Sequence, residues 1–289
     1  MKRSLLSVLF LIGILNFSIA QTGVKAARKV YAVLIGIDDY QNNQYLSDLN
    51  YTDDDAENMN VFLTDRQYGN VPEANITKLI GSAASKEQII TAMRNQFAKA
   101  TANDLVIFFY SGHGGVGLIC PWDYSPETKL SYTELKAELN RSRAAVKLCF
   151  IDACHAGSFS DRGVTTTATN TTGANRDIAM VMDTTAFKKS VNGISSSVGT
   201  KAATGQLFVF AACRKDETSQ EQGALQGGVF AYHLLKALKG EADYNHNKRI
   251  TVGELNQYLA GNIGNSNPNQ SPVTLGTRIG LNTIVMGVR

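Results

Sequence analysis

Apolar and polar positions along the chain alternate between short, almost uninterrupted apolar runs and longer amphipathic stretches. The runs Leu105 to Phe109 and Val146 to Ile151 are typical of strands that are buried on both faces of a parallel sheet. Helix-start signals stand between such runs, as at Asp53 to Asp55 and at Ser85, which is followed three residues later by Gln88. Strands that alternate with helices predict an α/β fold, with a mostly parallel central sheet between two helical layers.

The predicted elements follow one another in a regular order. Strands are expected at Lys29–Ile37, Asn75–Ile80, Asp104–Tyr110, Ala145–Ile151, Gln206–Ala212 and Thr283–Gly287. Helices are expected at Asp53–Thr64, Ser85–Lys99, Tyr132–Asn140, Val229–Lys239 and Val252–Ile263. Residues 161–205 are rich in Thr, Ser, Ala, Asn and Gly and have few large apolar side chains. This composition predicts a long loop between the two parts of the fold.

The first 20 residues resemble a signal peptide rather than a part of the fold. Lys2 and Arg3 give a basic start, residues 5–14 form an apolar core, and Ser18 and Ala20 supply the small residues of a cleavage site. The apolar core is short for a membrane-spanning anchor, which is the competing interpretation. We expect a secreted or periplasmic protein, divided into a signal peptide (1–20), a first region (21–160), a linker (161–205) and a second region (206–289).

Composition and cysteine usage narrow the class of protein. The chain has 289 residues, of which 44% are hydrophobic, and this is enough for one large domain with a sizeable core. A net charge of +3 is too small to indicate binding to nucleic acid or, after signal removal, to a membrane surface. Cys149 falls within a predicted strand as a buried hydrophobe. The spacing of the four cysteines indicates no zinc site, and a disulfide between Cys120 and Cys213 remains an open alternative.

Candidate chemistry lies where two of the predicted strands end. Tyr110-Ser111-Gly112-His113-Gly114-Gly115 follows one strand, and Asp152-Ala153-Cys154-His155-Ala156-Gly157 follows the other. Parallel strands end at the same edge of a sheet, so His113 and Cys154 are expected side by side, as a general base and a thiol nucleophile. The N–H groups of Gly114 and Cys154 can form an oxyanion hole. His155 is a rival base, but adjacent side chains in a turn usually diverge, which favours His113.

The two loops resemble those of the caspase-haemoglobinase clan of cysteine peptidases, and most closely the metacaspases and the bacterial orthocaspases. In that family YSGHG carries the catalytic histidine and D-x-C-H-S/A-G carries the nucleophile. Residues 50–59 keep the family's Asp-Ala-x-x-Met from Asp55, and residues 213–221 resemble a second motif, with Glu217 and Glu221 replacing Gln and Asp. The resemblance covers about residues 29–289. It implies a caspase-like three-layer α/β/α sandwich and the activity of a cysteine endopeptidase.

The resemblance also implies a substrate-binding pocket built from Asp55, Ser111 and Asp152. A negatively charged pocket attracts a basic side chain and repels an acidic one, so peptide or protein substrates are expected to be cleaved after Arg or Lys. Helix capping is the competing interpretation of Asp55. The predicted linker contains residues that such an enzyme would accept, which suggests self-cleavage, although ordinary solvating charges explain them equally well. These residues are Arg162, Arg176, Lys188, Lys189 and Lys201.

Residues 243–254 fit much of an EF-hand loop, with oxygen-bearing side chains at Asp243, Asn245, Asn247 and Glu254. Lys248 stands in place of the turn glycine and only two carboxylates are present, so a structural turn competes with a calcium site. We expect no required cofactor, with Ca²⁺ as the candidate ligand, and a monomeric protein. The competing classes are a clostripain- or gingipain-like peptidase of the same clan, a catalytically silent caspase-like interaction module, and a calcium-binding scaffold.

Overall fold

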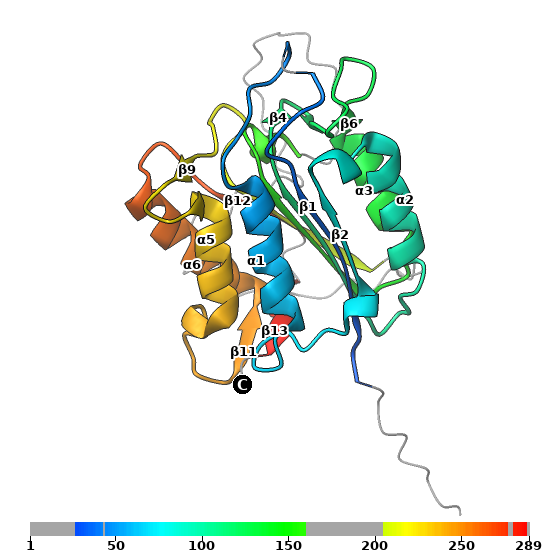
Figure 1. Ribbon diagram of the computed structural model, residues 1–289. Coiled ribbons are helices and arrows are strands. Elements are labelled where there is room, and N and C mark those ends of the chain that lie inside the picture. Colours follow the sequence, from blue (N-terminus) through cyan, green and yellow to red (C-terminus); the bar gives the residue numbers. More distant parts are fainter. Residues whose placement is uncertain (1–26, 43, 160–204, 277–279, 288–289) are drawn as a thin grey trace, which may run out of the picture.

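A computed structural model describes residues 27–42, 44–159, 205–276 and 280–287 (Figure 1). The predicted signal peptide lies outside these residues, and so does the predicted linker except for Gly205. None of the helices within the described ranges is long and apolar enough to cross a membrane.

A six-stranded sheet in the order β12-β8-β7-β3-β1-β2 runs through the centre of the molecule (Figure 1). Its strands are β1 (Val30–Gly36), β2 (Ile76–Ile80), β3 (Leu105–Ser111), β7 (Val146–Asp152), β8 (Gln206–Ala211) and β12 (Val273–Leu275). Five strands pair in parallel, and only β12 joins the edge in the antiparallel direction. Every residue of β3 and β7 is buried, because helices cover both faces, as the uninterrupted apolar runs predicted.

Helices cover the two faces of the sheet (Figure 1). On one face lie α1 (Thr52–Thr64), α5 (Val229–Lys236) and α6 (Val252–Ser266), and on the other lie α2 (Lys86–Phe97) and α3 (Tyr132–Arg141). Successive residues of a strand point to opposite faces. Phe109 and Phe150 therefore enter the core under α1 and α5, whereas Phe108 and Cys149 enter the core under α2 and α3. This architecture confirms the predicted three-layer α/β/α sandwich with a mostly parallel sheet.

Three small sheets lie beside the large one. The first is formed by β4 (Gly114–Gly115), β5 (Leu118–Ile119) and β6 (Leu130–Ser131), the second by β9 (Glu221–Gln222) and β10 (Gly227–Gly228), and the third by β11 (Arg249–Thr251) and β13 (Ile284–Gly287). The sequence pattern missed β12 and β11, because each has only three residues. The helix expected to reach Lys239 ends at Lys236. The chain continues in a π-helical turn over Ala237–Glu241, within which Gly240 has a φ of 126°.

The start of α1 differs from the prediction, which placed the N-cap within Asp53 to Asp55. The cap comes instead from Asp38, which lies 14 positions before Thr52. Oδ1 of Asp38 accepts the backbone N–H of Thr52 at 2.8 Å and that of Asp53 at 3.1 Å. Asp55 is therefore free of a capping role in its own helix, and its carboxylate turns towards the sheet edge.

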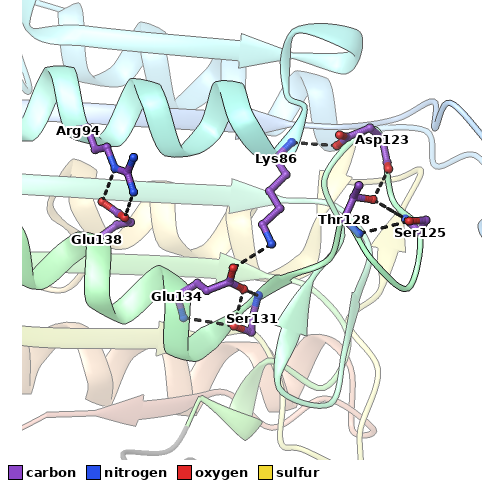
Figure 2. A network of polar contacts seen from close by, with 8 residues as sticks. All are labelled: Lys86, Arg94, Asp123, Ser125, Thr128, Ser131, Glu134 and Glu138. Atoms are coloured by element: carbon purple, nitrogen blue, oxygen red, sulfur yellow. Dashed lines mark hydrogen bonds and ion pairs between the residues drawn. The ribbon is translucent and has the colours of Figure 1, made fainter.

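A polar network joins α2, α3 and the loop that leads into β6 (Figure 2). The backbone N–H of Lys86 donates to Asp123 at 2.8 Å, and the ammonium group of Lys86 lies 2.8 Å from Glu134. Glu134 also completes a capping box with Ser131 at the start of α3. The other members of the network are Arg94, Ser125, Thr128 and Glu138. The network fixes β6, and through β6 it supports the small sheet that follows His113.

Candidate active site

The histidine and cysteine loops leave the large sheet side by side, because β3 and β7 are neighbours in register. Ser111 pairs with Asp152, and the N–H of Gly112 donates to the carbonyl oxygen of Asp152 at 3.1 Å. A Cβ atom at Gly114 would lie only 2.8 Å from Cβ of Ala153 and 2.9 Å from the carbonyl oxygen of Cys154. The two loops are thus in direct contact, and the close approach requires glycine at position 114.

The backbone and the imidazole ring of His113 each make a hydrogen bond to a residue that the sequence pattern did not indicate. Its backbone N–H donates to the hydroxyl oxygen of Tyr40 at 2.7 Å, and the Tyr40 ring lies 5.2 Å from the imidazole. Nε2 of His113 lies 2.7 Å from the carbonyl oxygen of Ser47. A carbonyl only accepts hydrogen bonds, so Nε2 carries the proton, and Nδ1 is left as the acceptor that a general base needs.

Cys154 follows β7 and is half-buried, with Sγ 3.9 Å from the carbonyl oxygen of Ser219. Burial raises the pKa of the Cys154 thiol. A thiol with a raised pKa needs a neighbouring base before it can act as a nucleophile. All four cysteines are free thiols, so the disulfide between Cys120 and Cys213 is not formed. Burial raises the pKa of each of these two thiols to about 12. They are therefore harder to deprotonate than an ordinary thiol.

The N–H of Gly114 points away from the neighbouring strand. The N–H of Cys120 donates to the carbonyl oxygen of His113 at 3.0 Å, which is one of the two bonds of a hydrogen-bonded antiparallel pair, while the N–H of His113 donates to Tyr40 instead. Such pairs alternate with pairs that exchange no hydrogen bonds, so the next pair, Gly114 and Ile119, is of the second kind. The Gly114 N–H is therefore directed outward from the ladder, beside the cysteine loop.

His155 is tied to the segment after β8. Its Nδ1 lies 2.8 Å from the carbonyl oxygen of Lys215, and its backbone N–H donates to the carbonyl oxygen of Glu217 at 3.0 Å. The residue adopts a left-handed conformation with a φ of 57°. These contacts give His155 a part in holding this segment against the cysteine loop, which favours His113 as the base.

Two buried carboxylates lie together behind the cysteine loop. Asp55 is 3% exposed and Asp152 is 5% exposed. Asp55 accepts the hydroxyl of Ser111 at 2.8 Å and the N–H of Gly228 at 3.2 Å. The structure thus brings together the three residues predicted to form the substrate pocket. Burial raises the pKa of both carboxyl groups, that of Asp152 to about 6, and the charge of Asp152 raises the pKa of Asp55 further.

The start of α5 completes this carboxylate pair. Asp152 accepts the N–H of Ala231 at 3.0 Å through Oδ2 and the hydroxyl of Ser219 through Oδ1. The N-cap residue of α5 is Gly228, which has no side chain, so Asp152 acts as the cap from a distant strand. A Cβ atom at Gly228 would lie 2.4 Å from Oδ2 of Asp152 and 2.9 Å from Oδ2 of Asp55. Glycine at this position therefore leaves room for both carboxylates.

Comparison with known domains identifies the family. A family model described as a caspase domain matches residues 29–278, which is most of the chain. The chain belongs to the caspase-domain family. Among curated proteins none matches it significantly. The caspase domain confirms the resemblance drawn from the two loops and is consistent with a metacaspase- or orthocaspase-like protein.

Two solved structures share the fold of this caspase domain. Protein GSU0716 from Geobacter sulfurreducens is 18% identical, with a TM-score of 0.58, over 90% of this chain and 99% of that one. Caspase-1 from Spodoptera frugiperda is 14% identical, with a TM-score of 0.55, over 86% of each chain. At these identities the likeness establishes the fold alone, and it confirms the caspase-like sandwich.

Of the four residues predicted to bind calcium, Asp243, Asn245 and Asn247 lie in the turn before β11, and Glu254 lies in the first turn of α6. Asp243 accepts the N–H groups of Asn247 at 3.1 Å and Lys248 at 2.9 Å, and Asn245 donates to Glu254 at 2.7 Å. Glu254 also completes a capping box with Thr251 at the start of α6. These oxygens already have protein donors, as in a structural turn. Within the described ranges, no group of three or more His, Cys, Asp or Glu residues could hold a metal ion.

Proposed function

We propose that this caspase domain is a cysteine endopeptidase that cleaves after Arg or Lys, with Cys154 as the nucleophile and His113 as the base. The single observation that carries the proposal is the buried carboxylate pair of Asp55 and Asp152, which adjoins the cysteine loop. Among the described residues neither carboxylate has an ion-pair partner. Two adjacent buried carboxyl groups repel each other when both are ionised, so a ligand that brings a cation would be favoured there.

In the proposed reaction the Cys154 thiol gives its proton to Nδ1 of His113, and the sulfur bonds to the substrate carbonyl carbon. The electron pair of the carbonyl moves to its oxygen, which the N–H groups of Gly114 and Cys154 stabilise. Collapse of this intermediate breaks the C–N bond, and the leaving amine takes the proton from His113. Water, deprotonated by His113, then hydrolyses the thioester and restores the thiol.

Specificity would come from the charge of the pocket. A guanidinium or ammonium group near Asp55 and Asp152 is attracted strongly in a buried, low-dielectric setting, whereas a carboxylate is repelled. Such a pocket accepts peptides and proteins with a basic residue before the scissile bond. We further propose export to the periplasm or the medium, self-cleavage within residues 161–205, and catalysis without a required cofactor.

Fluorogenic peptides that differ only in the residue before the scissile bond test this function. We expect cleavage after Arg and Lys by purified protein that begins at Gln21, and at least about tenfold lower kcat/KM for citrulline, the uncharged isostere of Arg. A Cys154→Ala variant is the matched control and should be inactive. Faster cleavage after Asp than after Arg would contradict the pocket, and an active Cys154→Ala protein would contradict the nucleophile.

Self-cleavage and calcium are tested with the same proteins. Wild type should fragment during purification at one or more of the predicted basic positions, and the Cys154→Ala protein should stay intact. Equal fragmentation of both would remove the case for self-cleavage. Added Ca²⁺ and EGTA should leave kcat/KM unchanged within about twofold if no cation is required. A larger loss with EGTA that Asp243→Ala reproduces would instead assign a calcium site to the turn.

A further inference from the structure

Gln270 lies between α6 and β12 and is completely buried, although no sequence motif pointed to it. Its Nε2 donates to the carbonyl oxygen of Ala212 at 3.2 Å and to the hydroxyl oxygen of Ser219 at 3.2 Å. Its Oε1 accepts the N–H of Gln220 at 3.2 Å. The amide thus uses both of its hydrogens and its oxygen, as a buried amide must if it is not to destabilise the fold.

Backbone groups of fixed polarity determine which way this amide faces. The carbonyl oxygen of Ala212 can only accept and the N–H of Gln220 can only donate, so the Gln270 amide has one permitted orientation. Its second N–H hydrogen then points at the oxygen of Ser219. Because the Ser219 oxygen is already an acceptor in this contact, its own hydrogen is directed to Oδ1 of Asp152. The result is a one-way chain of donors from Gln270 through Ser219 to Asp152.

We propose that Gln270 is a positioning residue for the basic-residue pocket, which compels Ser219 to donate to Asp152 and so keeps Asp152 as the anionic acceptor for a basic substrate. The inference rests on the proposed function and deepens it. Gln270 touches neither the thiol nor the carboxylate pair. It acts through Ser219, whose carbonyl oxygen also faces the sulfur of Cys154.

The surroundings of Asp152 make this donor important. The acidic groups Asp55 on α1 and Glu221 on β9 lie near Asp152, and their negative charges disfavour its ionised form. The charge of Asp152 also raises the pKa of the thiols of Cys154 and Cys213. Among the described residues, the groups that oppose this repulsion are two hydrogen-bond donors, the Ser219 hydroxyl and the Ala231 N–H at the start of α5. Loss of one donor therefore shifts the protonation equilibrium of Asp152 towards the neutral acid.

Gln270→Glu tests the proposal with almost no change in side-chain volume. A carboxylate at this position accepts the Ser219 proton, which reverses the direction of the chain and leaves Asp152 without this donor. We expect the acidic limb of the pH profile of kcat/KM for the Arg substrate to move up by about one unit, so that kcat/KM falls about twofold at pH 7 and about tenfold at pH 5, through a higher KM. Cleavage of the uncharged citrulline substrate should change less than about twofold.

Gln257→Glu, the same change at an exposed position on α6, is the matched control and should match wild type. Ser219→Ala removes the donor directly and should reproduce the pH shift, so it decides the question if Gln270→Glu does not fold. An unshifted pH profile, or equal losses with the Arg and citrulline substrates, would overturn the proposal. A wild-type protein that cleaves neither Arg nor Lys substrates would instead refute the proposed function.

Discussion

At the scale of single residues, the orientation of the candidate site residues depends on hydrogen bonds to groups outside the two sequence motifs. Tyr40 accepts from the backbone of His113, and Ser47 orients its ring. Gly228 and Ala231 hold the two carboxylates. Each of these contacts joins groups that are far apart in the sequence. The histidine and cysteine loops bring the atoms that we propose to react, and these partners determine their protonation and direction.

Tyr40→Phe should leave the partly buried N–H of His113 without its hydroxyl acceptor. We expect a loss of about 1–3 kcal/mol in the free energy of unfolding, measured by urea denaturation, and a lower kcat on the Arg substrate. Tyr45→Phe is the control, because Tyr45 is 47% exposed and packs edge-on against Tyr124. A Tyr40→Phe protein as stable and active as Tyr45→Phe would show that this hydrogen bond has no role.

The pH dependence of cleavage should reveal the carboxylate pair. Burial raises the pKa of Asp152 to about 6, so the ionised form that a basic substrate needs is lost as the pH falls through about 6. We expect kcat/KM for the Arg substrate to decrease below this pH, whereas the citrulline substrate should lack this limb. Identical profiles for the two substrates between pH 5 and 7 would contradict the assignment.

At the scale of elements, helix starts are the points where local sequence and distant contacts meet. α2 and α3 begin with capping boxes formed by residues three positions apart. α1 and α5 have no such local cap and are capped by Asp38 and Asp152 from the ends of strands or the loops that follow them. The helices without a local cap are those that line the candidate site, so the acidic side chain that stabilises α5 is also one that we propose for substrate binding.

Ser131→Ala should weaken the start of α3 and the network in Figure 2. We expect a loss of about 1–2 kcal/mol in the free energy of unfolding, because the variant removes a side-chain cap. Arg94→Ala, which breaks an exposed ion pair between α2 and α3, should cost less than Ser131→Ala. Urea denaturation of both variants checks the order, and a larger effect for Arg94→Ala would contradict this account.

At the scale of the whole molecule, the candidate site is assembled from both sides of the predicted linker. The first region supplies Cys154, His113 and the carboxylate pair, and the second supplies Ser219 and the start of α5. The two regions are joined in the large sheet by the pairing of β7 with β8. Val146 is the partner of Gln206 at one end, and Ile151 is the partner of Ala211 at the other. The second region therefore forms part of the same core.

A cut in the linker should leave the two regions together, because separation would expose β7 and β8 along their whole length. We expect Cys154→Ala protein, nicked by trypsin within residues 161–205, to elute as one species in size-exclusion chromatography, with both fragments on a denaturing gel. Intact protein run alongside is the control. Separate elution of the two fragments would show that the pairing does not hold them.

Several elements and both loops of the candidate site were predictable, because they depend on neighbours in the sequence. β3 and β7 were evident from apolar runs, since a strand buried on both faces has no polar alternation. Ser85 with Gln88 marked a helix start through contacts three residues apart. The two loops identified His113 and Cys154 because parallel strands end at a common edge. The signal peptide and the self-cleavage positions remain predictions.

The sequence by itself determined the layered α/β architecture and the candidate residues His113 and Cys154, since burial patterns and strand ends are local properties of the chain. Only the tertiary structure decided that Asp38 caps α1, that Gly228 leaves room for two carboxylates, and that Gln270 contacts the hydroxyl of Ser219. These features depend on the polarity and distance of groups that lie between 14 and 173 positions apart. No local pattern records such contacts, because they exist only once the sheet has brought the segments together.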